Sequence, residues 1–141
     1  MLQLHFLNFL LPLFIPFPCI LQPERLGQLL FHIGDLNGAI TAFNNTVALG
    51  EKYGDKKEIA QGYGNLGVVY EKHGDLDKAI VFYQKSLKLD EELNRKQNMA
   101  LNYSNLGQVY ESRGDLDKSL EFHQKALSLN ELQHLSRAYP Q

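Results

Sequence analysis

The sequence predicts an all-α protein made of about three repeated pairs of antiparallel helices. The tripeptide Gly-Asp-Leu begins at residues 34, 74 and 114, so it recurs every 40 residues. Between these tripeptides the apolar residues fall at the spacing of one face of a helix. Self-similarity at a fixed period is the signature of a repeat protein, in which each unit buries its apolar face against the next.

The composition excludes several other classes of protein. A chain of 141 residues has room for one domain or for a few small repeats that share a core. The formal net charge of -2 provides no general positive field to attract nucleic acid, so we expect no nucleic-acid partner. The single cysteine, Cys19, excludes an internal disulfide and a cysteine-rich zinc site, and we expect no metal or other cofactor.

Residues 1–22 differ from the rest of the chain and read MLQLHFLNFLLPLFIPFPCILQ. A secretory signal would need a basic start and small residues at a cleavage site, and this segment has neither. A membrane-spanning helix would need about 20 uninterrupted apolar residues, whereas Pro12, Pro16 and Pro18 interrupt this run. We favour a non-native or disordered arm outside the repeat fold. We therefore expect a cytoplasmic protein, with secretion or membrane anchoring as the alternative if residues 1–22 act as a signal.

The second repeat shows the helical pattern most clearly. A first apolar stripe ends before Gly74-Asp75 and a second stripe follows it. Glycine can adopt the left-handed conformation that ends a helix, and aspartate can cap the free N–H groups of the next one. The stripes consist of Tyr63, Leu66, Gly67 and Tyr70, then Ala79, Ile80, Tyr83 and Leu87.

The same signals set the other helix limits. Gly114-Asp115 repeats the stop and start, and Asp55 with Glu58 resembles a capping box. Asn94 replaces glycine at the corresponding junction, and asparagine also tolerates a left-handed turn. We expect helices over 24–33, 36–52, 56–73, 76–93, 97–113 and 116–134, arranged as units 23–53, 54–93 and 94–134 with a tail at 135–141.

Two glycines lie inside predicted helices, where glycine is unfavourable. Gly67 and Gly107 occupy the same position of successive repeats. Their recurrence predicts that a neighbouring helix packs closely against the missing side chain. Ala79 and Ala126 are expected to allow the same close approach on the second helices.

This arrangement resembles the tetratricopeptide repeat family. That family places a large residue, Leu-Gly and Tyr on the first helix, and Ala, an aromatic residue and Ala on the second. The resemblance covers residues 23–134 and implies a right-handed α-solenoid, although the period is 40 rather than about 34 residues. Long-period arrays of this kind are similar to those of kinesin light chains, Pins-like adaptors and bacterial scaffold proteins. The matching residues are Tyr63, Leu66, Gly67, Tyr70, Ala79, Tyr83 and Ser86; Tyr103, Leu106, Gly107, Tyr110, Ser119, His123 and Ala126; and, in a degenerate first unit, Pro23, Leu26, Gly27, Leu30, Ala39, Phe43 and Thr46.

The resemblance implies that a protein or peptide partner binds in a concave groove lined by the first helices, as in an adaptor or scaffold. Asn65 and Asn105 precede Leu-Gly one repeat apart, and comparable asparagines bind peptide backbone in the long-period family members. Alternatively, the two asparagines bond to neighbouring helices and only fix the superhelical twist. The groove positions that the resemblance implies are Arg25, Gln61, Asn65, Val68, Glu71, Leu101, Asn105, Gln108 and Glu111.

No catalytic pattern accompanies the repeats. The five histidines are scattered, without the spacing of a metal-ligand motif, and there is no nucleotide-binding loop or nucleophile elbow. We therefore expect the protein not to be an enzyme.

Both ends of the array are predicted to be incomplete. Residues 16–22 align with the start of the first helix of the next repeat, but their prolines exclude a helix. At the other end no helix follows to cover Leu120, Leu127 and Leu129. The chain is therefore expected to be part of a longer array or to associate with itself through its ends. A purely architectural fragment of a larger signalling protein or enzyme is the alternative to a peptide-binding module.

Overall fold

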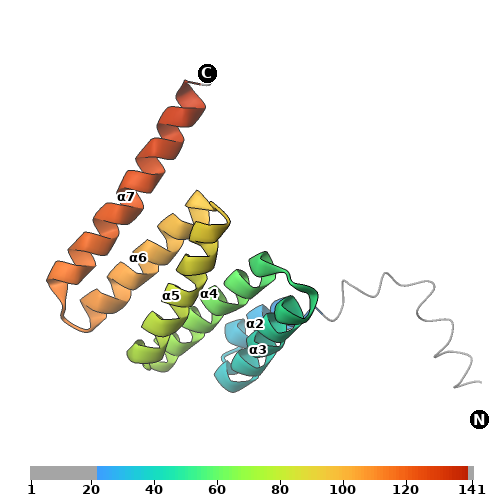
Figure 1. Ribbon diagram of the computed structural model, residues 1–141. Helices are drawn as coiled ribbons and strands as arrows, with labels where there is room; N and C mark the ends of the chain where they lie inside the picture. Colours follow the sequence, from blue (N-terminus) through green and yellow to red (C-terminus); the bar gives the residue numbers. More distant parts are fainter. Residues whose placement is uncertain (1–21, 140–141) are drawn as a thin grey trace, which may run out of the picture.

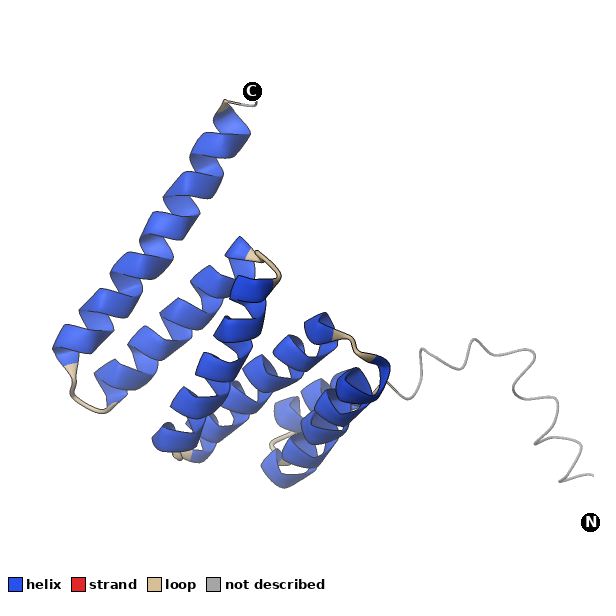
Figure 2. Cartoon of the chain, viewed as in Figure 1, coloured by secondary structure: helices blue, strands red, loops and turns tan. Residues whose placement is uncertain are grey.

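The computed structural model describes residues 22–139, and six helices account for nearly all of this range (Figure 1). The described part of the chain contains no strand, and short loops join the helices (Figure 2). The predictions for residues 1–21 lie outside the described residues. The helices are α2 (Pro23–His32), α3 (Leu36–Tyr53), α4 (Lys56–His73), α5 (Leu76–Glu92), α6 (Lys96–Ser112) and α7 (Leu116–Ala138).

The helices form three antiparallel pairs, α2–α3, α4–α5 and α6–α7, stacked one after another along the array. Each helix packs against the next one in the chain, so the first helix of a pair also contacts the second helix of the preceding pair. This is the predicted all-α solenoid.

The helix ends follow the predicted Gly-Asp rule. Gly74 has a φ of 87°, and the Asp75 carboxylate accepts a hydrogen bond from the N–H of Lys78 at 3.2 Å. Gly114 and Asp115 repeat this arrangement. Asn94 is left-handed, with a φ of 52°, so asparagine replaces glycine at this turn as expected.

The capping box predicted at Asp55 is only half formed. The Asp55 carboxylate accepts from the N–H groups of Lys57 and Glu58, at 3.0 and 3.2 Å. The backbone N–H of Asp55, which a capping box would direct to Glu58, instead donates to the carbonyl of Gly50 at 2.8 Å. The turn that ends α3 therefore uses the backbone N–H of Asp55, which is the donor that a capping box with Glu58 would need.

Helix α7 is longer than predicted. The sequence pattern placed its end at residue 134 and a tail at 135–141, whereas the helix continues to Ala138. Residues 131–138 contain no glycine or proline, and Leu, Glu, Gln, Arg and Ala favour helix, so nothing local stops it before Pro140.

The core lies between neighbouring repeats. On α3, Ala39, Phe43 and Val47 pack with Leu66 and Val69 of α4. An equivalent cluster 40 residues later joins α5 to α6, so each repeat buries its apolar face against the next one. That second cluster consists of Ala79, Ile80, Tyr83, Leu87, Leu106 and Val109.

Candidate functional site

The candidate site lies on the first helices of the three repeats, α2, α4 and α6. Arg25, Asn65 and Asn105 occupy one position of the repeat, 40 residues apart. Arg25 is exposed, and the two asparagines are half-buried. The helix pairs thus present the predicted asparagines at equivalent points of two neighbouring repeats.

Both asparagine side chains are half-buried, and neither contributes a hydrogen bond to the described part of the fold. Within residues 22–139, the amides of Asn65 and Asn105 form no hydrogen bond with another protein group, and the Asn65 Nδ2 atom is buried without a partner. A buried donor of this kind ordinarily has a partner. The alternative in which these residues bond to neighbouring helices therefore finds no supporting hydrogen bond here.

The other residues on the same helices combine polar and apolar surface. Gln61 and Gln108 are exposed. Val68 is 36% exposed and Leu101 is 60% exposed, although both lie in the middle of regular helices. Exposed aliphatic side chains of this kind leave apolar area on the surface of these helices.

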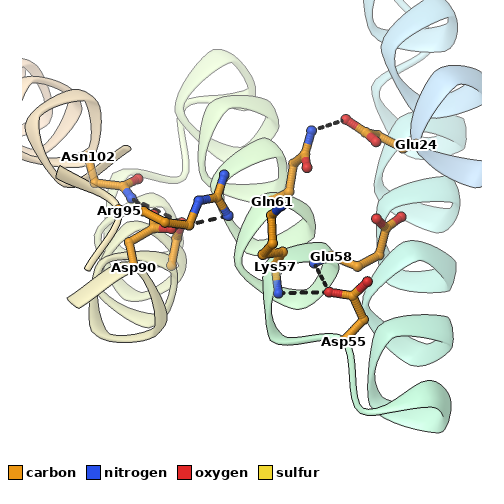
Figure 3. Close-up of polar contacts among 9 residues, drawn as sticks. Glu24, Asp55, Lys57, Glu58, Gln61, Asp90, Arg95 and Asn102 are labelled. Atoms are coloured by element: carbon orange, nitrogen blue, oxygen red, sulfur yellow. Dashed lines mark hydrogen bonds and ion pairs between the residues drawn. The ribbon is translucent and has the colours of Figure 1, made fainter. Parts of the chain in front are cut away.

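Gln61 connects the first repeat to the second. Its Nε2 atom donates to Glu24 on α2 (Figure 3). The Glu24 carboxylate also accepts from Gln28 Nε2 at 3.3 Å. Sequence reasoning missed Glu24 because the corresponding residues, Gly64 and Ser104, are small and outside the repeat pattern. A carboxylate at a position where the other two repeats have small residues was the sequence signal that could have identified Glu24.

The two glutamates that were predicted to line a groove, Glu71 and Glu111, differ although they share a repeat position. Glu71 accepts a hydrogen bond from the Tyr83 hydroxyl at 2.7 Å and is held against α5. Burial raises the pKa of Tyr83, so its phenol stays protonated and donates this bond. His123 replaces Tyr83 in the next repeat, and Glu111 is exposed. The Glu71 carboxylate therefore already accepts a hydrogen bond within the fold.

A buried polar network lies between α5 and α6 (Figure 3). Asn102 Nδ2 donates to Ser86 at 3.0 Å and to the Asp90 carboxylate at 2.9 Å. Arg95 NH1 lies 3.4 Å from the same carboxylate, whose side chain is 1% exposed. Burial raises the pKa of Asp90, and the lowering effects of Arg95 and of its hydrogen bonds are smaller. Thr46, Gly50 and Gly62 occupy the corresponding positions one repeat earlier, so this network belongs to one junction only.

Two further properties concern the described residues as a whole. Over residues 22–139 no three His, Cys, Asp or Glu side chains gather where they could hold a metal ion. Within the same range, each helix is too short or too polar to cross a lipid bilayer.

Comparison with known families decides the classification. The tetratricopeptide repeat model matches residues 20–92 and 58–132, which together cover most of the sequence. The chain belongs to the tetratricopeptide repeat family. The predicted family and fold are therefore confirmed, and the degenerate first unit falls within the matched range.

Solved tetratricopeptide and related structures share this architecture. The crystal structure of MamA is 29% identical, with a TM-score of 0.66 over 79% of this chain and 58% of MamA. BtubC (BKLC) from P. vanneervenii is 21% identical, with a TM-score of 0.74 over 79% of this chain and 46% of its own. The TPR domain of Arabidopsis FLU is 19% identical, with a TM-score of 0.73 over 78% of this chain and 92% of that domain. The last two show similarity of fold alone.

None of the curated proteins with which the chain was compared matched it. The chain spans just over half the length of MamA. As a tetratricopeptide repeat protein it is a protein–protein interaction module, built on a repeat fold that is generally non-catalytic.

Proposed function

We propose that the surface formed by α2, α4 and α6 binds an extended peptide segment of a partner protein, as in an adaptor or scaffold. The observation that supports this most directly is the pair of asparagines, Asn65 and Asn105. They repeat in register, and their amides form no hydrogen bond within residues 22–139.

The chemistry of the asparagine amide suits a peptide backbone. An asparagine amide has two N–H donors and one carbonyl acceptor, and rotation of the half-buried Asn65 side chain would bring its buried Nδ2 atom within reach of a peptide backbone. Two such amides one repeat apart would hold the backbone at two points and leave side-chain selection to their neighbours. Val68 and Leu101 supply apolar contact surface for a side chain of the partner.

The test uses the full chain as bait in affinity capture, with bound proteins identified by mass spectrometry. Wild type is compared with Asn65→Ala/Asn105→Ala. Overlapping peptides from any captured protein are then titrated against both forms by fluorescence anisotropy. We expect the double variant to bind the selected peptide about 10-fold or more weakly, from the loss of two hydrogen bonds of about 0.5–1.5 kcal/mol each.

The matched control is Asn44→Ala/Asn45→Ala, which makes the same chemical change at two exposed positions of α3. Unchanged binding by this control and weakened binding by the first variant would support the proposal. Equal binding by all three forms, with unchanged circular dichroism, would show that the asparagines do not contact the peptide.

A second candidate is an architectural role, in which the repeats join copies of the chain or other domains. The exposed apolar faces at the two ends of the array favour it. Both roles can coexist, because the residues proposed to bind peptide differ from the exposed leucines of α2 and α7.

A further inference from the structure

Helix α7, the last helix that the structure describes, exposes apolar residues whose counterparts are covered in the preceding repeats. Leu127 is 58% exposed, whereas Leu87 and Val47, at the same position of the earlier repeats, are each 8% exposed. Leu120 is 59% exposed against 7% for Ile80. In the earlier repeats the first helix of the next pair covers this face. Figure 1 shows α7 at the edge of the array.

Helix α2 exposes an apolar face that is buried in α4 and α6, the first helices of the other two repeats. Leu26 is 45% exposed and Leu29 is 59% exposed. The residues at the same repeat positions on α4 and α6 are fully buried, because α4 packs on α3 and α6 packs on α5. Helix α2 therefore presents the face that normally contacts the second helix of a preceding pair. The four counterparts, Leu66, Val69, Leu106 and Val109, are each 0% exposed.

The exposed face of α7 and the exposed Leu26 and Leu29 of α2 correspond to parts of the two sides of an interface that the described helices already form twice. The α3–α4 and α5–α6 contacts each join a face like that of α7 to a face like that of α2, in the same 40-residue register. We propose that α7 of one copy binds α2 of a second copy, so that copies stack head to tail as a continuation of the repeat array. Such a contact is heterologous, and it leaves one free end on each copy for further addition.

The polar residues at this interface are also compatible. At the internal α5–α6 junction, Asn102 donates to Asp90. The residues in the same register are Gln22 at the start of α2 and Asn130 on α7, and both are exposed. Two neutral amides can exchange a donor and an acceptor, so this contact places no unpaired charge between the copies.

The test exploits the fact that the two faces are different. Leu127→Glu blocks the α7 face, and Leu29→Glu blocks the α2 face, each in the full chain. Both leucines are more than half exposed, so each change should leave the repeat fold intact, which circular dichroism and thermal unfolding will verify. Association is measured by sedimentation velocity from about 10 µM to about 1 mM, the range of weak interfaces.

The wild-type chain is expected to form a concentration-dependent series of species larger than a dimer. Each single variant should remain monomeric at concentrations about 10-fold higher than those at which the wild type associates. An equimolar mixture should form a 1:1 dimer that does not grow, because Leu127→Glu supplies the intact α2 face and Leu29→Glu the intact α7 face. Val81→Glu is the control, since Val81 is 47% exposed on α5, belongs to neither of the two faces and should associate like the wild type.

Several results would overturn the proposal. If Leu29→Glu alone still forms dimers, α7 pairs with α7; if Leu127→Glu alone does so, α2 pairs with α2. A mixture that stays monomeric would exclude contact between unlike faces. A wild type that stays monomeric at about 1 mM would exclude association through these ends in the range of weak interfaces.

Discussion

The ring of Tyr83 occupies the space in which a β-carbon on Gly67 would lie. The Tyr83 Cδ1 and Cε1 atoms are each 2.6 Å from that position, and the tyrosine is 1% exposed. Gly107 meets the ring of His123 in the same way, at 2.8 Å, and Gly27 meets Phe43 at 2.6 Å. Each pair of helices thus packs an aromatic ring of the second helix against a glycine of the first.

This relationship predicts that Gly67→Ala destabilises the protein, although alanine is the better helix former. Alanine would gain about 1 kcal/mol from helix propensity. Its methyl group, however, would collide with a buried ring that the Glu71 hydrogen bond also holds in place. Such overpacking typically costs about 1–3 kcal/mol, and we expect a net loss of stability in urea unfolding.

Gly64→Ala provides the comparison for this experiment. Gly64 lies in the same helix, but its added β-carbon would be 3.4 Å from the nearest atom, Ser86 Oγ. This variant should be unchanged or more stable by up to about 1 kcal/mol. Equal stability of the two variants would show that α4 and α5 separate easily and that the glycine is not required.

The buried carboxylate of Asp90 predicts a pH dependence with a definite sign. Burial raises the pKa of Asp90 above its ordinary value of 3.8, so the native state binds this proton more tightly than the unfolded state. The contribution of Asp90 to stability therefore falls as pH rises from 3.8 through the native pKa. Asp90→Asn removes this titration and keeps an oxygen that can accept from Asn102.

The measurement is the free energy of unfolding of the wild type and of Asp90→Asn at a series of pH values from about 3.5 to 7. The stability of Asp90→Asn relative to the wild type should increase with pH across the window above 3.8. Taking the difference cancels the titration of the other carboxylates. A relative stability that decreases with pH would mean that attraction to Arg95 outweighs burial at this site.

Arg25 occupies the same repeat position as Asn65 and Asn105, and this predicts that Arg25→Asn increases the affinity for the peptide. Arg25 is exposed, and replacing it by asparagine would add a third amide in the same position of the array. If Asn65 and Asn105 contact the peptide backbone, Arg25→Asn should bind a selected peptide about 2–10-fold more tightly, which is the effect of one further hydrogen bond.

Arg25→Ala distinguishes this effect from the mere loss of a positive charge. Only the asparagine variant should gain affinity in the same anisotropy titration. Equal affinities for the two variants would show that the peptide does not reach the first repeat through an amide contact.

Much of this architecture could be predicted from the sequence because its signals are local. The left-handed turns at Gly74 and Asn94 and the caps at Asp75 and Asp115 depend on a few neighbouring residues. The close approach at Gly67 was also predictable, because glycine recurs at an unfavourable position inside a helix. The extension of α7 to Ala138 was not predicted, since its end depends on the absence of a local stop signal.

The sequence by itself determined the repeat, the family and the helix limits apart from the end of α7, because backbone preferences and apolar periodicity act over a few residues. The tertiary structure decided how the polar side chains are used. Gln61 reaches a glutamate 37 residues away, Glu71 is held by Tyr83 while Glu111 is exposed, and the Asn65 Nδ2 atom is left without a partner within residues 22–139. These differences arise between residues that share a repeat position. Hydrogen bonding depends on which side chains neighbouring helices bring within about 3 Å, and periodicity alone does not specify that.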